Sequence, residues 1–121
     1  MFKHLALLLY SGMLYAGGWQ QAQKPTGRAE RARALGLPVP DELVQASGWA
    51  MIVGAAALQV RPLRRAAALV VAAQLLPITW IGHRFWEMEE GAQRMQNQIH
   101  FYKNVSMIGS ALYIAATADC E

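Results

Sequence analysis

Residues 66–86 read AAALVVAAQLLPITWIGHRFW, an apolar run whose only charged side chain lies near its end. A helix that crosses a membrane needs about 20 consecutive, mostly apolar residues, and this run has that length. Three further apolar stretches cover residues 5–23, 43–60 and 99–118. We therefore expect an all-α fold, an integral membrane four-helix bundle in which residues 1–121 form a single domain.

The composition favours a membrane protein and narrows the possible functions. The chain is 55% hydrophobic and 16% charged, whereas soluble domains contain about 25% charged residues. The mean hydropathy of +0.16 is mild, so a soluble helical bundle is the less favoured alternative. A formal charge of +3, from basic residues that do not form one stripe, argues against nucleic acid as a partner. The single cysteine, Cys120, excludes an internal disulfide and a cysteine-based metal site.

Small residues recur at four-residue intervals on the first two predicted helices. Such pairs let membrane helices approach closely. The pairs are Gly12 with Ala16, Gly18 with Ala22, and Ala50 with Gly54. In the third helix, we expect Gln74 to hydrogen-bond to a neighbouring helix and Pro77 to introduce a kink.

The connections between the helices differ in length and charge. In residues 24–42, apolar positions and the arginines Arg28 and Arg31 fall on different sides of a possible helix. We expect this long first loop to be partly interfacial, with these arginines directed toward lipid headgroups. Residues 61–65 form a tight basic turn between two antiparallel helices. Because basic residues in short loops stay inside the cell, we expect this turn and both termini in the cytoplasm.

Polar side chains gather where the third and fourth predicted helices meet. His100, Lys103 and Asn104 share one face of the fourth helix, because residues three and four apart are neighbours. By the same spacing, His83 and Trp86 share a face of the third helix. The loop that joins these helix ends places both sets at one membrane boundary. Ionisable groups at such a position indicate a functional site by default.

Carboxylates and aromatic rings near this cluster keep a second interpretation open. Three loop residues are available as counter-ions: Glu87, Glu89 and Glu90. In the simpler interpretation, Lys103 extends to the headgroups and the rings form an interfacial aromatic belt. Those rings are Phe85, Trp86, Phe101 and Tyr102. A metal between His83 and His100 lacks an obvious third ligand, so no metal site is expected.

Two sequence blocks carry a family resemblance. The blocks are GHRFWE at residues 82–87 and QIHFYKNVSMIGSAL at 98–112. They resemble the His-x-Phe-Trp end of the third helix and the His-Phe-x-Lys-Asn start of the fourth in the DoxX family, a group of small bacterial four-helix membrane proteins. The ALGLP segment at 34–38 and the basic turn extend the resemblance over nearly the whole chain. The resemblance implies a multi-pass protein of the bacterial inner membrane. It nominates as site residues His83, Phe85, Trp86, His100, Lys103 and Asn104.

The resemblance also implies a role beside redox enzymes. Relatives in the family include quinone-reducing subunits of thiosulfate oxidation systems and partners of membrane-associated oxidoreductase complexes. We favour a non-enzymatic accessory subunit of a redox or respiratory membrane complex, whose partners are the lipid bilayer and other membrane subunits. The alternative is a quinone-interacting subunit of an oxidoreductase, and quinone is the only candidate cofactor. In a third hypothesis, Lys103 and Arg84 recognise an anionic lipid headgroup.

Overall fold

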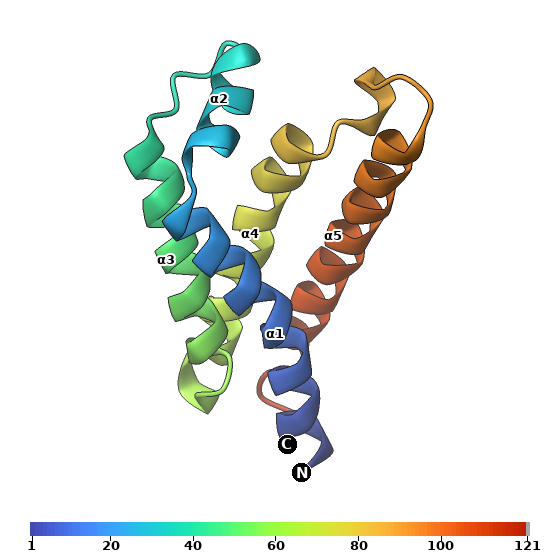
Figure 1. The fold of residues 1–121 in the computed structure, drawn as a ribbon. Helices are drawn as coiled ribbons and strands as arrows, with labels where there is room; N and C mark the ends of the chain where they lie inside the picture. The colour runs from blue at the N-terminus through green and yellow to red at the C-terminus, as the bar shows by residue number, and fades with distance from the viewer. Residues whose placement is uncertain (121) are drawn as a thin grey trace.

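The computed structural model describes residues 1–120, and every regular element among them is helical. The elements are α1 (Phe2–Gln23), α2 (Thr26–Ala34), α3 (Asp41–Ala57), η1 (Arg61–Leu63), α4 (Arg64–Gly82), η2 (Phe85–Glu87) and α5 (Ala92–Ala116). Figure 1 labels the α-helices. The all-α prediction is confirmed. The four long helices correspond to the four apolar stretches, and α2 is the short helix expected in the first loop.

One helical stretch has both the length and the composition of a membrane span. Within residues 1–120, this is Arg61–Glu87, the stretch that contains α4. Of the four predicted spans, this helix alone is supported by both length and composition. α4 also runs through Pro77 as one helix. The expected bond of Gln74 to a neighbouring helix is confirmed, because its Nε2 donates to the Ser47 carbonyl oxygen at 3.0 Å.

The last long helix starts earlier than its apolar stretch predicts. α5 begins at Ala92, whereas the sequence places the start near residue 99. Gly91 precedes it with φ of +150°, a conformation open to glycine because it lacks a Cβ. The following residues, AQRMQNQ, include several good helix formers. The polar extension therefore adds turns to α5 and brings Asn97 beside the end of α4.

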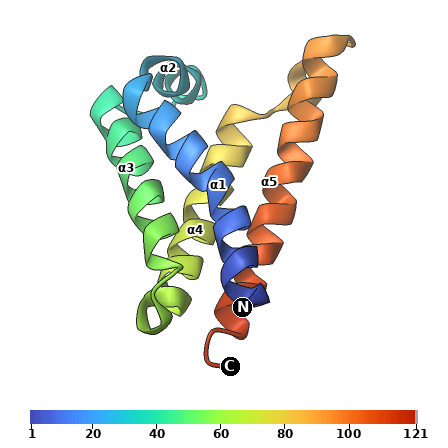
Figure 2. The same cartoon turned by 60° about the horizontal axis from the view of Figure 1, so that its bottom comes forward.

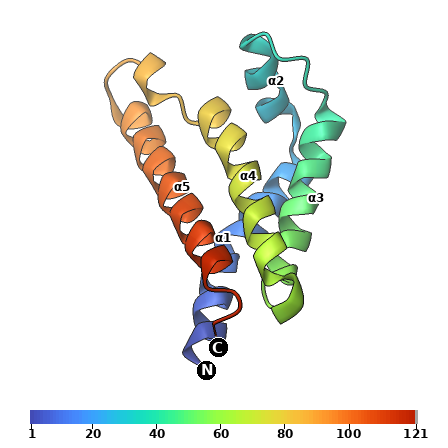
Figure 3. The same ribbon diagram turned by 180° about the vertical axis from the view of Figure 1, so that it is seen from behind.

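The long helices form two pairs that lie apart at one end of the molecule. α1 packs along α3, α4 packs along α5, and α3 also contacts α4. Figures 1 and 3 show both termini and the basic turn at one end, with α2 and the α4–α5 connection at the other. We call these the closed end and the open end. Figure 2 shows α1 crossing diagonally from α3 toward α5.

The crossing of α1 and α3 depends on two glycines. A Cβ built on Gly18 would lie 2.7 Å from the Gly48 carbonyl oxygen, and one on Gly48 would lie 2.7 Å from the Ala22 nitrogen. The prediction of close packing is correct for Gly18 and Ala22, which are buried here. It is wrong for Gly12 and Ala50, which are exposed. Gly48, which the sequence pattern did not single out, supplies the close approach on α3.

Alanines make up six of the eleven residues of the buried core cluster, and many large apolar side chains lie on the exterior. The alanines of the buried cluster are Ala55, Ala67, Ala68, Ala72, Ala111 and Ala115. Large side chains that are more than half exposed include Leu8, Leu9, Trp19, Val53, Leu76, Trp80 and Leu112. A water-soluble domain buries its large apolar residues instead. Lipid tails are as apolar as leucine, so helices in membranes pack through small residues.

Two cations hold the C-terminal end of α5 at the closed end. The Lys3 ammonium donates to the carbonyl oxygens of Thr117 at 3.1 Å and Cys120 at 3.0 Å. Arg65 Nε donates to the Ala115 carbonyl oxygen at 3.2 Å. Positive groups are favoured at a helix C-terminus, where carbonyl groups lack partners. These contacts join α1 and α4 to α5 and keep the closed end together.

Arg64 has a different position from the one its basic turn suggested. The side chain is fully buried, and its Nε donates to the Leu58 carbonyl oxygen at 2.8 Å. Its Nη2 lies 3.4 Å from the Gln59 carbonyl oxygen. Arg64 therefore satisfies carbonyl groups just beyond the end of α3 instead of facing a membrane surface. The antiparallel hairpin predicted from this turn is present, with α3 packed against α4.

Candidate functional site

A cleft of about 590 Å³ lies between the helix pairs and reaches the open end. Its apolar lining comes from the middle of the long helices and includes Met13, Leu14, Met51, Leu75 and Met107. Apart from Ser47 on α3, its polar lining comes from α1, α2, α5 and the residue after α4, and includes Gln20, Gln21, Arg28, Arg31, His83, His100, Lys103 and Asn104. Such a lining suits a ligand with a polar group on an apolar body.

Two histidines from different segments meet in this cleft. The ring centroids of His83 and His100 are 5.2 Å apart, and their planes are inclined by 29°. Nδ1 of His83 lies 3.1 Å from Oδ1 of Asn97. Since an amide oxygen only accepts hydrogen bonds, Nδ1 is the donor in this contact. The early start of α5 thus supplies the group that orients His83.

The cleft carries an excess of positive charge. Lys103 is partly buried on α5, and Arg28 and Arg31 reach the cleft from α2. Arg28 Nη2 donates to Gln20 Oε1 at 3.2 Å. Burial and the neighbouring Arg31 lower the pKa of Arg28, although an arginine remains charged at neutral pH. None of the carboxylates in residues 1–120 lines the cleft, so its field favours an anion.

A family comparison accounts for most of the chain. The protein-family model described as DoxX matches residues 4–84. The chain belongs to the DoxX family. The match runs from α1 to the residues after α4, while the block at 98–112 lies outside it. No curated protein and no solved structure matches this DoxX chain. The family is membrane-associated, which agrees with the apolar helix α4.

Aromatic residues of this DoxX protein form a separate cluster outside the cleft. The Phe101 ring centroid lies 5.5 Å from that of Phe85 and 5.6 Å from that of Trp86, both in edge-on geometry. Tyr102 lies 6.1 Å from Phe85. None of these four rings lines the cleft. We call these four residues the outer aromatic cluster; they connect η2 to the first half of α5.

Arg84 belongs with this outer aromatic cluster. Its guanidinium lies 4.8 Å from the ring centroid of Trp80, and its Nη2 is 2.7 Å from Glu87 Oε1. Glu87 is therefore the partner of Arg84 and not a counter-ion of the cleft. Glu89 and Glu90 are exposed and lie outside the cleft as well. The expectation that these loop carboxylates balance the histidine and lysine cluster is wrong.

The structure divides the seven predicted site residues into two groups. The cleft group is His83, His100, Lys103 and Asn104. The outer group is Arg84, Phe85 and Trp86. The predicted common face of His83 and Trp86 is wrong, because α4 ends at Gly82 and the helical spacing no longer applies beyond it. The 3-10 turn η2 then carries the outer group away from the cleft.

Arg28 and Arg31 are cleft residues that the sequence assigned to the lipid headgroups. They line the cleft because α2 packs against α3 and α4. The alanines Ala29 and Ala32 of α2 are buried in that contact. These two small residues were the available signal, since a helix packed on protein needs a small apolar side whereas a helix lying on lipid favours large apolar residues.

The arrangement can bind and orient a polar group that accepts hydrogen bonds. Lys103, Arg28 and Arg31 supply charged donors, Asn104 supplies an amide, and the two imidazoles supply ring nitrogens that can donate or accept hydrogen bonds. Among residues 1–120, no group of three His, Cys, Asp or Glu side chains is placed to hold a metal ion. The polar part of the cleft can therefore bind a group that is anionic or rich in hydrogen-bond acceptors, and the apolar part can hold the rest of the ligand.

Proposed function

We propose that this DoxX protein crosses the bacterial inner membrane four times and acts as a non-enzymatic, ligand-binding accessory subunit of a membrane complex. The apolar exterior supports four spans, because every long helix presents large apolar side chains outward. The lengths of α1 and α5, 22 and 25 residues, match the roughly 20 residues that a span requires. In this arrangement the open end lies at one membrane boundary.

The observation that carries the proposal is the charge of the cleft. Its charged lining residues are all basic, and the described carboxylates lie elsewhere. The cleft also has no cysteine in its lining. It thus offers hydrogen-bond donors and positive charge that bind a ligand, and we assign any chemical conversion to a partner subunit.

The exposed ring pair of Trp19 and Trp49, with centroids 5.8 Å apart, is a suitable anchor at the bilayer boundary.

Purification in a mild detergent should retain partner proteins with this chain. An accessory subunit is held in its complex by its apolar flanks, which gentle extraction preserves. The preparation is analysed by native mass spectrometry, with identification of each bound protein. A lone, stable monomer recovered from the native membrane at every detergent concentration would contradict the accessory role.

A quinone-interacting subunit is the second candidate, favoured by the histidine pair. His83 and His100 place two imidazoles side by side over an apolar lining. A quinone needs donors for its carbonyl oxygens and an apolar space for its ring, and a histidine can deliver protons during reduction. Organic extraction of the same preparation tests this role: quinone bound in stoichiometric amount would favour it over the accessory role.

A further inference from the structure

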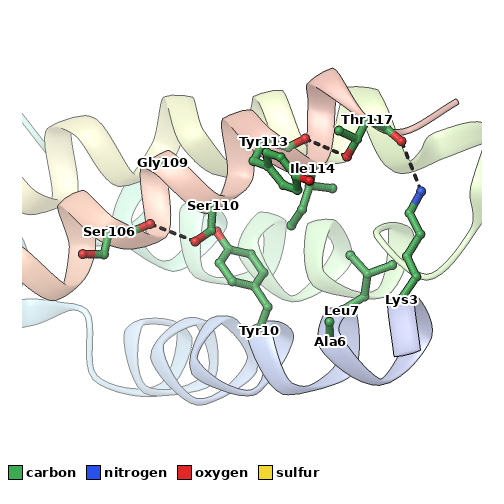
Figure 4. A pocket seen from close by; sticks show the side chains of 10 residues that line it. All are labelled: Lys3, Ala6, Leu7, Tyr10, Ser106, Gly109, Ser110, Tyr113, Ile114 and Thr117. Carbon is green, nitrogen blue, oxygen red and sulfur yellow. Dashed lines mark hydrogen bonds between the residues drawn. The ribbon is translucent and has the colours of Figure 1, made fainter. Parts of the chain in front are cut away.

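A second hollow, of about 560 Å³, lies on the flank of the bundle between α1 and α5. Figure 4 shows the side chains that line it, with Leu7 and Tyr10 from α1 facing Gly109, Ser110 and Ile114 from α5. It extends toward the closed end, where Lys3 and Thr117 border it. We call this hollow the flank groove. Neither the family match nor the predicted site residues include the α5 side of it.

The flank groove is apolar in effect, although several hydroxyl groups line it. Ser110 Oγ donates to the Ser106 carbonyl oxygen at 3.0 Å, and Thr117 Oγ1 donates to the Tyr113 carbonyl oxygen at 2.8 Å. Such bonds to the preceding turn satisfy a hydroxyl within its own helix. The Tyr10 hydroxyl is satisfied as well, because it donates a hydrogen bond to the Met107 carbonyl oxygen. These three hydroxyl groups are satisfied by carbonyl oxygens, and Ala6, Leu7 and Ile114 supply apolar surface, so the groove suits a hydrocarbon chain.

The cleft and the flank groove lie one after the other along the same α1–α5 seam. Tyr10 lines the groove, and its hydroxyl donates to the carbonyl oxygen of Met107, which lines the cleft, at 2.6 Å. On α1, the cleft residue Leu14 is one helical turn from Tyr10. From Lys103 to Tyr113 the rise along α5 is about 15 Å at 1.5 Å per residue. That length equals roughly half of a 30 Å hydrocarbon layer.

We propose that the cleft and the flank groove together bind one anionic amphiphile, with a phosphate-bearing head in the cleft and a hydrocarbon chain in the groove. This inference rests on the proposed function, because it names the ligand class of the same cleft. The head lies among Lys103, Arg28 and Arg31, which suit phosphate oxygens through charged hydrogen bonds. The chain passes Tyr10 and fills the space beside Gly109.

The unbalanced charge decides between an anionic lipid and a neutral quinone. A quinone would leave the cations of the cleft without a counter-charge, whereas a phosphate group neutralises part of it. A free phosphate would satisfy the cations but would leave the groove empty. The two cavities together therefore favour a molecule that carries both features.

Lipid titration of the purified protein, followed by native mass spectrometry, tests this inference. Phosphatidylglycerol should bind about tenfold or more tightly than phosphatidylcholine with the same chains, because each nearby basic residue favours an anionic lipid by roughly fivefold and the cleft has three. K103Q, which removes one of the three cleft cations, should reduce that preference roughly fivefold, while R94Q, which removes a charge outside the cleft, should leave it intact. Inorganic phosphate should compete poorly with the lipid.

The placement of the hydrocarbon chain in the flank groove is tested with the variant G109L. A Cβ on Gly109 meets nothing within 4 Å, so the leucine fills the groove without displacing the backbone. G109L should weaken the binding of long-chain phosphatidylglycerol severalfold and leave the binding of dihexanoyl phosphatidylglycerol unchanged. The matched control is G12L, since Gly12 also has open space but lines neither cavity.

Three results would overturn the inference. They are equal binding of the two lipids, undiminished long-chain binding by G109L, and equal competition by inorganic phosphate. Each leaves the accessory role standing if partner proteins still co-purify, so failure of the ligand assignment is distinguishable from failure of the proposed function.

Discussion

G48L should prevent α1 and α3 from packing and should abolish recovery of folded protein from the membrane. A Cβ at Gly48 would lie 2.6 Å from the Gly18 carbonyl oxygen and 3.1 Å from the Gln21 carbonyl carbon. Both are backbone atoms, which cannot rotate away as a side chain can. Overpacking of a core costs about 1–3 kcal/mol, and a clash with the backbone of a neighbouring helix exceeds that range. The measurement is the monodisperse fraction after detergent extraction, together with its thermal midpoint.

The matched control for this experiment is G12L on α1. A Cβ at Gly12 meets nothing within 4 Å, and both changes replace a helical glycine by leucine. Leucine has the higher helix propensity, by roughly 0.8 kcal/mol, so G12L should be neutral or stabilising. If G48L protein were as abundant and as heat-stable as G12L protein, the α1–α3 crossing described above would be incorrect.

G17L should empty the cleft of its ligand while the fold is preserved. Gly17 lines the cleft, and a Cβ there meets nothing within 4 Å, so the leucine side chain enters the space that the ligand needs. A steric cost of about 1–3 kcal/mol corresponds to roughly 5- to 150-fold weaker binding, since 1.4 kcal/mol is tenfold. Mass spectrometry of organic extracts gives the amount of lipid and quinone retained per mole of protein.

The thermal midpoint separates lost binding from lost structure in this variant. G17L and G12L should unfold at closely similar temperatures, because a Cβ at either position meets nothing within 4 Å. Wild-type retention of lipid and quinone by G17L would show that the cleft is not where these molecules bind.

The helices were predictable from the sequence because they depend on local pattern. Apolar length identified the four long helices, and the basic turn at 61–65 identified the hairpin of α3 and α4. The start of α5 was missed because residues 92–98 are polar, and apolar length gives no signal for a polar helix. Gly48, the partner of Gly18, was missed because no small residue lies four positions before or after it in the sequence. Its role becomes visible only in the crossing of α1 and α3.

The candidate site was predictable only in part, for a related reason. Helical spacing brought His100, Lys103 and Asn104 together, because they lie on one continuous helix. The same spacing failed for Trp86, since α4 ends at Gly82 and η2 redirects the chain. The position of Arg28 depends on how α2 packs across the bundle. Such a tertiary contact is not encoded in the pattern of one segment.

The central claim, that four spans separate the closed end from the open end, is tested by cysteine labelling in sealed membrane vesicles. The native thiol of Cys120 is exposed at the closed end, and E30C and E90C, each in a C120S background, place exposed thiols at the open end. A membrane-impermeant maleimide should label Cys120 only from the cytoplasmic side, and E30C and E90C only from the opposite side. Labelling of E90C and Cys120 from the same side would contradict four spans and the location of the cleft at a membrane boundary.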